Sequence, residues 1–157
     1  MSLESVRAFF AAKAPDIHII ELTESTATVE LAARGHGVAP AQIAKTLSVR
    51  VGERRFLIVT CGIGRLDNKK AKTVFGGKVS MLGAEEVLEI TSHPVGGVCP
   101  FGLPRDLPIY CDISLKAFDE VVPAAGSTHS AVRISPLRMA ELVGAQWVDV
   151  CLTPDAV

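Results

Sequence analysis

The 157-residue sequence contains no uninterrupted apolar run of the roughly 20 residues that a membrane-spanning helix requires. Its first residues, MSLESVRAFFAAKAP, also lack the basic start and the long apolar stretch of a secretion signal. These two absences predict a cytoplasmic protein with no membrane partner. The length suits one domain, residues 1–157, and an apolar share of 48% is enough to form its core.

Cysteine is scarce and scattered, and the sequence has neither a C-x-x-C pair nor histidines clustered at zinc-ligand spacing. We therefore expect no metal site. In a reducing compartment, cysteines of this kind are mostly small buried hydrophobic residues. The four are Cys61, Cys99, Cys111 and Cys151.

The common phosphate and hydrolase signatures are also missing. GIGRLDNKK does not match a G-x-x-x-x-G-K-[ST] loop, and GGVCPFG does not match a G-x-G-x-x-G turn. The G-x-S-x-G sequence of α/β-hydrolases does not occur. These absences predict chemistry that uses no cofactor.

The net charge is only −1, but the charges are unevenly distributed. Residues 45–78 contain nine basic and two acidic side chains, whereas residues 79–125 contain seven acidic and two basic ones. Such asymmetry indicates a local surface for a polyanion, and an ordinary solvated face is the alternative.

The apolar pattern predicts helices and strands in irregular alternation, which favours a mixed or mainly antiparallel sheet. We expect helices at 2–13, 26–34, 38–45, 83–91 and 135–144, with a basic loop and short helix at 65–77. We expect strands at 17–22, 46–51, 55–61, 78–82, 107–113 and 146–151, and a strand pair within 121–134. Lys45 would then lie at a helix-to-strand junction.

Residues 92–104, SHPVGGVCPFGLP, crowd three glycines and three prolines around one cysteine and one histidine. Gly96 and Gly97 allow backbone conformations closed to other residues, while Pro94 and Pro100 restrict the chain on both sides. A rigid loop of this kind can direct backbone N–H groups at the oxyanion of acyl transfer. A tight surface turn is the other interpretation.

Three segments carry a resemblance to a known family: AQIAKTLSVRVGERRFLIVTCGIGRLDNKKAK, SHPVGGVCPFGL and VVPAAGSTHSAVRISP. Their order and spacing resemble the YbaK/prolyl-tRNA-synthetase-associated family, with Lys45 in its AKTL context and Gly96 to Pro100 as its G-x-x-x-P loop. The resemblance implies a mixed α/β domain with a curved, barrel-like sheet flanked by helices. It also implies metal-independent hydrolysis of a mischarged aminoacyl-tRNA.

The resemblance leads to a hypothesis for the site, in which the 3′-terminal adenosine and its amino acid enter a cleft between Lys45 and the Gly96–Pro100 loop. Lys45 would act as a fixed cation, and Gly96 and Gly97 would donate N–H groups to the ester carbonyl. His129 would position water or the ribose. Other expected substrate-binding residues are Thr46, Asp67, Val98, Cys99, Pro100 and Ser127. The expected tRNA-binding residues are Arg65, Lys69, Lys70 and Lys72, which would contact phosphates.

The expected partners are an aminoacyl-tRNA, with tRNA(Pro) as the leading candidate and the tRNA still open, and prolyl-tRNA synthetase, but not DNA. The amino acid removed stays open among alanine, cysteine, serine and threonine. One alternative is a module that binds tRNA or the synthetase without cleaving anything. Another is a hydrolase of free esters or peptides that uses the Cys99 thiol as its nucleophile.

Overall fold

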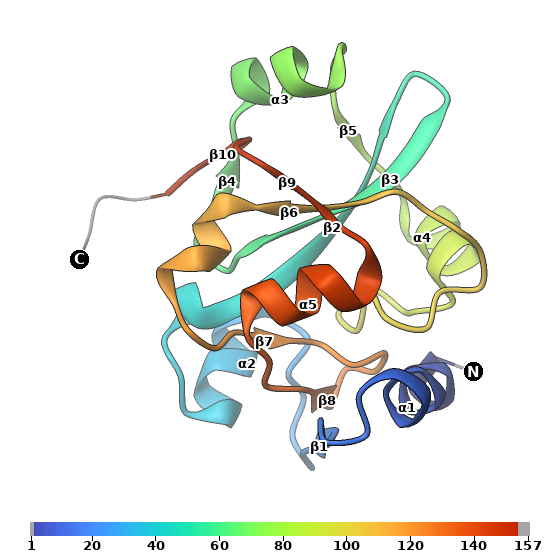
Figure 1. Ribbon diagram of the computed structural model, residues 1–157, viewed down its shortest axis with the longest axis vertical. Helices are drawn as coiled ribbons and strands as arrows, with labels where there is room; N and C mark the ends of the chain where they lie inside the picture. Colours follow the sequence, from blue (N-terminus) through green and yellow to red (C-terminus); the bar gives the residue numbers. More distant parts are fainter. Residues whose placement is uncertain (1, 154–157) are drawn as a thin grey trace.

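The computed structural model describes residues 2–153, and its centre is a six-stranded mixed sheet (Figure 1). The helices are α1 (Ser2–Lys13), α2 (Val29–His36), α3 (Asn68–Phe75), α4 (Ala84–Thr91) and α5 (Pro136–Val143), with 3-10 turns η1 (Pro40–Gln42) and η2 (Ile113–Ala117). The main sheet contains β2 (Ile43–Val51), β3 (Arg54–Cys61), β5 (Ser80–Met81), β6 (Ile109–Asp112), β7 (Val122–Pro123) and β9 (Gln146–Val148). Two small antiparallel pairs join β1 (Ile20–Glu21) to β8 (Ser130–Ala131) and β4 (Arg65–Leu66) to β10 (Cys151–Leu152).

The strand order of the main sheet is β5-β2-β3-β6-β9, and β7 also pairs with β2. β2 runs antiparallel to β3 and to β5. The pairs β2–β7, β3–β6 and β6–β9 are parallel. The predicted mixed α/β fold with a mixed sheet is therefore confirmed, but none of the described sheets closes into a barrel.

The β2–β3 hairpin is the longest strand pair, and it forms where the sequence predicted it. Its register places Thr46 opposite Val59 and Ser48 opposite Leu57, and Gly52 turns the chain with φ of 60°. The prediction of a helix over 38–45 is wrong, because only Pro40–Gln42 form a 3-10 turn and β2 begins at Ile43. Lys45 therefore belongs to the strand.

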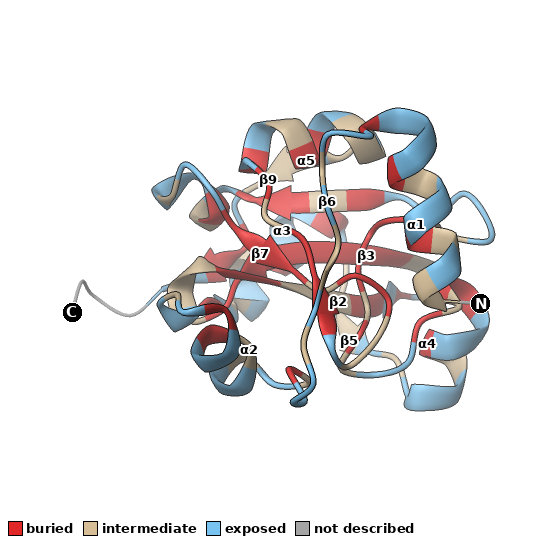
Figure 2. Cartoon of the chain, turned by 90° about the horizontal axis from the view of Figure 1, so that it is seen from below, coloured by how far each residue is buried: buried red, intermediate tan, exposed pale blue. Residues whose placement is uncertain are grey.

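The central strands of the sheet are mostly buried (Figure 2), and hydrophobic side chains pack in two clusters, one on each face. On one face, Phe10 of α1 and Met139 of α5 pack with sheet residues such as Val59. On the other face, Phe75 of α3 packs against Phe56, with ring centroids 4.7 Å apart. The hairpin is thus fixed between two cores, and its β2 strand provides a rigid support for the site.

Several helices begin and end at the capping residues found in the sequence. The side chain of Ser135 accepts a hydrogen bond from the Arg138 N–H at the start of α5, and Gly144 ends this helix in the left-handed conformation. Asp67 caps α3 in the same way by accepting from the Lys70 N–H. None of the helices within residues 2–153 has the length and apolar character that spanning a membrane requires.

Candidate functional site

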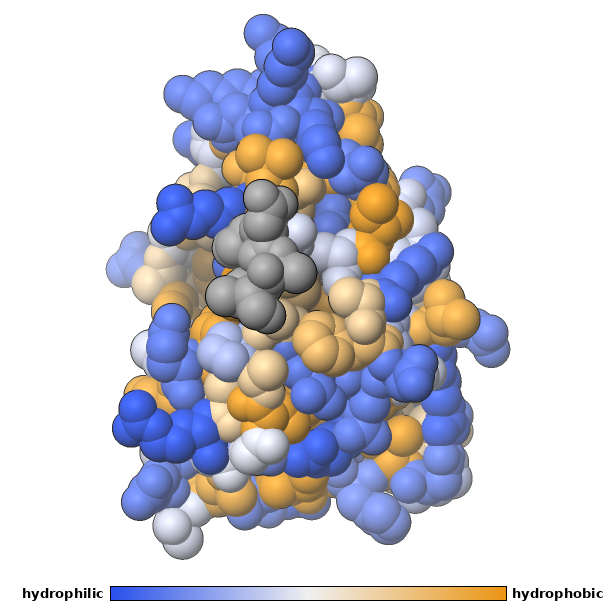
Figure 3. All heavy atoms as spheres, turned by 90° about the vertical axis from the view of Figure 1, so that its left-hand side faces the viewer, coloured by the Kyte–Doolittle hydropathy of each residue, from blue (hydrophilic) through white to orange (hydrophobic). Residues whose placement is uncertain are grey.

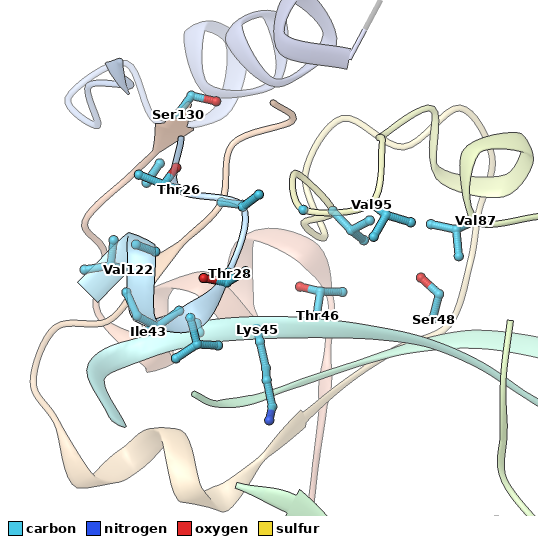
Figure 4. A pocket seen from close by; sticks show the side chains of 18 of the residues that line it. Thr26, Thr28, Ile43, Lys45, Thr46, Ser48, Val87, Val95, Val122 and Ser130 are labelled. Carbon is cyan, nitrogen blue, oxygen red and sulfur yellow. The ribbon is translucent and has the colours of Figure 1, made fainter. Parts of the chain in front are cut away.

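A cavity of about 260 Å³ lies on one side of β2, between this strand, the start of α2 and the loop after α4 (Figure 4). Four of the predicted site residues line it, namely Lys45, Thr46, Gly96 and Val98. The remaining wall is mostly apolar and includes side chains such as Ile43, Val87, Val95 and Val122.

Successive side chains of a strand point to opposite faces, and this alternation separates Lys45 from its neighbours. Thr46 and Ser48 rise from β2 on the side where Thr28, Val87 and Val95 lie, whereas the side chain of Lys45 points away (Figure 4). The Lys45 ammonium donates instead to the Gly64 carbonyl, with Nζ and O 2.7 Å apart. Lys45 and the Gly96–Pro100 loop therefore do not face each other across the cavity.

The glycine-proline loop forms the wall opposite Thr46. Gly96 has a φ of 92°, which an L side chain rarely adopts, and a Cβ there would lie 2.9 Å from the Cβ of Ala27. No acceptor within the described residues pairs with the backbone N–H of Gly96 or Val98. The Cys99 N–H also has no acceptor in residues 2–153, but Cys99 does not line the cavity, whereas Gly96 and Val98 do.

Gly97 plays a different part from the one predicted, because its N–H is already used. It donates to the Pro94 carbonyl at 2.9 Å, and the Gly97 carbonyl accepts from the Gly126 N–H at 3.0 Å. A Cβ at position 97 would lie 2.8 Å from the Ser127 backbone. Gly97 thus closes a turn and joins the loop to residues 126–127, and the prediction that it offers a bare N–H is wrong.

The buried imidazole of His93 links the glycine-proline loop to the start of α1. Its Nδ1 lies 2.6 Å from the Ser2 hydroxyl, and its Nε2 lies 2.8 Å from the Phe101 carbonyl. Burial lowers the pKa of His93, although the bond to Phe101 opposes this shift. A neutral ring therefore connects the start of α1 to the end of the loop.

The side chain of Cys99 points into the protein interior and does not line the cavity. Its side chain is fully buried, and burial raises the pKa of its thiol to about 12, so the reactive thiolate is not formed near neutral pH. Its Sγ is 3.5 Å from Nε2 of His93, but the same nitrogen is bonded to the Phe101 carbonyl. This burial argues against the alternative of a thiol nucleophile.

The other predicted site residues lie outside the cavity. His129 is exposed, its Nδ1 is 2.9 Å from the Thr128 hydroxyl, and its carbonyl accepts from Leu22 in the loop beside β1. Asp67 is occupied as the cap of α3. Pro100 is buried. Ser127 does not line the cavity, but its hydroxyl lies 2.6 Å from the hydroxyl of Ser130, which does.

The predicted tRNA-binding residues gather on and beside α3, at the top of the molecule, where hydrophilic side chains cover the surface (Figure 3). Arg65, Lys69 and Lys72 are exposed. Lys70 differs, because its ammonium pairs with the Asp149 carboxylate at 2.9 Å and donates to the Cys151 carbonyl at 3.2 Å. Three of the four predicted cations are thus exposed to solvent.

Sequence reasoning missed Thr26, Thr28, Ser48 and Ser130, whose hydroxyl-bearing side chains line the cavity with Thr46. The period of two along β2 could have identified Ser48 from Thr46. No sequence pattern identified Thr26, Thr28 or Ser130, which lie in other segments of the chain. Within residues 2–153, no three His, Cys, Asp or Glu side chains gather as metal ligands would.

Comparison with known families identifies the class of protein to which this fold and cavity belong. Residues 23–142 match the aminoacyl-tRNA editing domain, and the chain belongs to this family. It is 46% identical to the uncharacterized protein YwhH of Bacillus subtilis, over 96% of this chain and 98% of that protein. It is 31% identical to a proline–tRNA ligase of Bacillus licheniformis, over 68% of this chain but only 19% of the ligase.

Solved structures agree with this assignment. A crystal structure described as a candidate trans-editing enzyme for prolyl tRNA synthetase superposes with a TM-score of 0.87 at 32% identity, covering 94% of this chain and 95% of that one. The hypothetical protein APE2540 has the same TM-score at 30% identity, over 94% of this chain and 99% of that one. The predicted YbaK-like family is thereby confirmed.

Proposed function

We propose that the protein hydrolyses the ester of a mischarged aminoacyl-tRNA, with tRNA(Pro) carrying a small noncognate amino acid as substrate. The 3′-terminal adenosine and its amino acid would enter the cavity beside β2. Water attacks the ester carbonyl carbon, the bond from this carbon to the ribose oxygen breaks, and the ribose oxygen takes a proton. The products are the free amino acid and an uncharged tRNA.

The observation that carries this proposal is the Gly96 N–H, which has no acceptor among the described residues 2–153 and lies beside a cavity of about 260 Å³. Together with the N–H of Val98, it offers a donor pair for the negative charge that develops on the ester oxygen. Donors held in place before reaction stabilise such charge most strongly, because they need no reorganisation. The left-handed φ of Gly96 supports this orientation of the loop.

Among the residues that line the cavity, Lys45 has the one titratable side chain, and it points away from the cavity (Figure 4). The proposed reaction therefore uses no protein base. A ribose hydroxyl of the substrate would orient the water, which suits an activated ester. We assign Lys45 a positioning role, in which its bond to Gly64 fixes the segment that leads to the basic α3.

The exposed cations Arg65, Lys69 and Lys72 are proposed to contact tRNA phosphates. Prolyl-tRNA synthetase is the proposed partner, since part of a proline–tRNA ligase resembles this chain and a structural neighbour is described as acting in trans for that enzyme. Lys70 would contribute less, because Asp149 already neutralises it.

The test is a deacylation panel of tRNA(Pro) charged with alanine, cysteine, serine or threonine, with Pro-tRNA(Pro) as the cognate control. We expect selective hydrolysis of at least one noncognate ester. Activity should fall strongly when the tRNA is reduced to an aminoacyl-adenosine, because remote binding supplies orientation. A folded protein that binds tRNA but hydrolyses no ester would instead be a binding module.

A further inference from the structure

Two hydroxyl groups of the cavity wall have no hydrogen-bond partner within residues 2–153. They are Oγ1 of Thr46 and Oγ of Ser48, both shielded from solvent, and Ser48 is only 4% exposed. Both side chains rise from β2 toward the cavity (Figure 4). Because they are two residues apart on one strand, they present their hydroxyls on the same face.

The three other hydroxyls of this wall are engaged within the protein. Thr26 donates to the Thr128 carbonyl at 3.1 Å, and Thr28 accepts from the Leu31 N–H at 3.1 Å. Ser130 bonds to Ser127 at 2.6 Å. The absence of a partner is therefore particular to Thr46 and Ser48 and not a general property of the wall.

A buried hydroxyl without a partner destabilises a fold, so such a group indicates a partner that arrives with a ligand. We propose that Thr46 and Ser48 bind the side-chain hydroxyl of the amino acid, and that the esters removed are those of serine and threonine. This inference rests on the proposed function and identifies the substrate class of the same site.

A hydroxyl suits these residues because it can donate one hydrogen bond and accept another. Alanine and proline side chains can do neither, and would leave both protein hydroxyls unpaired. The thiol of cysteine is a weaker donor and acceptor. The apolar neighbours Val87 and Val95 line the same cavity, where they can contact the carbon atoms of the side chain.

The test uses two stable analogues, 3′-amino-3′-deoxyadenosine carrying a seryl or an alanyl group through an amide bond. Calorimetry gives the Kd of each for the wild type, Ser48→Ala and Thr46→Val. We expect the wild type to prefer the seryl analogue, and each substitution to reduce that preference about 3- to 10-fold, the effect of one neutral hydrogen bond. The alanyl Kd should change little.

Ser130→Ala is the matched control, since it removes a hydroxyl from the same wall whose bond lies within the protein. It should keep the seryl-to-alanyl ratio of the wild type. Melting curves verify that each variant is folded. The amide analogues cannot be hydrolysed as esters, so this test remains decisive even if the protein proves inactive on every mischarged tRNA.

Equal Kd values for the two analogues would overturn the inference, as would failure to bind either one. A uniform loss of affinity for both analogues in Ser48→Ala would also contradict it, because the hydroxyl would then contact a group common to all amino acids. In the deacylation panel, hydrolysis of the alanyl ester in preference to the seryl and threonyl esters would leave the editing function standing and remove this specificity.

Discussion

The Lys45 ammonium lies 2.7 Å from the carbonyl oxygen of Gly64, on the opposite side of β2 from the cavity. Gly64, the residue before β4, is thus bonded to a side chain of β2 through a charge-assisted hydrogen bond. Arg65 follows Gly64 directly, and the exposed cations of α3 come next. Lys45 is therefore suited to hold the proposed tRNA-binding segment in place.

Lys45→Met should remove this bond and lower the free energy of unfolding by about 1.5–3 kcal/mol, the usual contribution of a hydrogen bond to a charged group. If Lys45 acts by positioning, KM for the mischarged tRNA should rise more than kcat falls. Urea unfolding and steady-state deacylation measure the two effects. The matched control is Lys78→Met, which replaces an exposed lysine without a hydrogen-bond partner in residues 2–153. A large fall in kcat with unchanged stability would instead place the ammonium at the ester.

Gly97→Ala should destabilise the protein by about 1–3 kcal/mol, because the added methyl group overpacks a site only 2.8 Å from the Ser127 backbone. The comparison is Gly83→Ala, where the new methyl group meets no atom within 4 Å. Chemical denaturation of both variants gives the difference. Equal stability of the two would mean that the loop does not pack against residues 126–127 as described.

Cys99→Ala should retain deacylation, since the buried thiol, with its pKa raised to about 12, does not reach the cavity. We also expect iodoacetamide to leave Cys99 unmodified in the native protein at pH 7.5 and to alkylate it in urea, as peptide mass spectrometry can verify. Loss of activity in a folded Cys99→Ala protein would restore the thiol-nucleophile alternative.

The buried His93 predicts a fall in stability on acidification. Burial lowers its pKa from 6.5 in the folded state, so below about pH 6.5 the unfolded chain binds a proton that the folded chain does not. The free energy of unfolding should therefore decrease as the pH falls from 7 toward 5. The decrease should be smaller in His93→Gln than in the wild type.

Cys99→Ala is the control for this pH series, because it disturbs the packing beside the ring and keeps the imidazole. It should be less stable than the wild type at each pH while retaining the wild-type slope. A His93→Gln protein with the full wild-type slope would show that His93 does not cause the pH dependence.

The sequence predicted the β2–β3 hairpin and most helix ends, because alternation and capping residues are local signals. It also identified Gly96 and Thr46 as site residues, and both line the cavity. The direction in which the Lys45 side chain points was harder to predict from the sequence. A family motif led us to place this side chain in the cavity. Side chains along β2 alternate between the two faces of the sheet, however, so Lys45 and Thr46 point in opposite directions.

The remaining differences depend on long-range contacts, which a local pattern does not contain. The close contact of Gly97 with the Ser127 backbone joins segments about 30 residues apart. The carbonyl of His129 bonds to the Leu22 N–H beside the β1–β8 pair, and the residue is exposed to solvent. Ser130 belongs to β8 of this pairing, and Thr26 is held nearby by its hydrogen bonds to the Thr128 carbonyl.

The most direct test of the proposed chemistry is single-turnover hydrolysis of mischarged tRNA(Pro) by Gly96→Ala, with Gly83→Ala as the control. The methyl group at position 96 conflicts with the left-handed φ and with Ala27, so it should displace the N–H donors without altering the basic surface. We predict a rate about 100-fold or more below the wild type, with the Kd for tRNA unchanged. A folded Gly96→Ala protein that hydrolyses the ester at the wild-type rate would contradict the account.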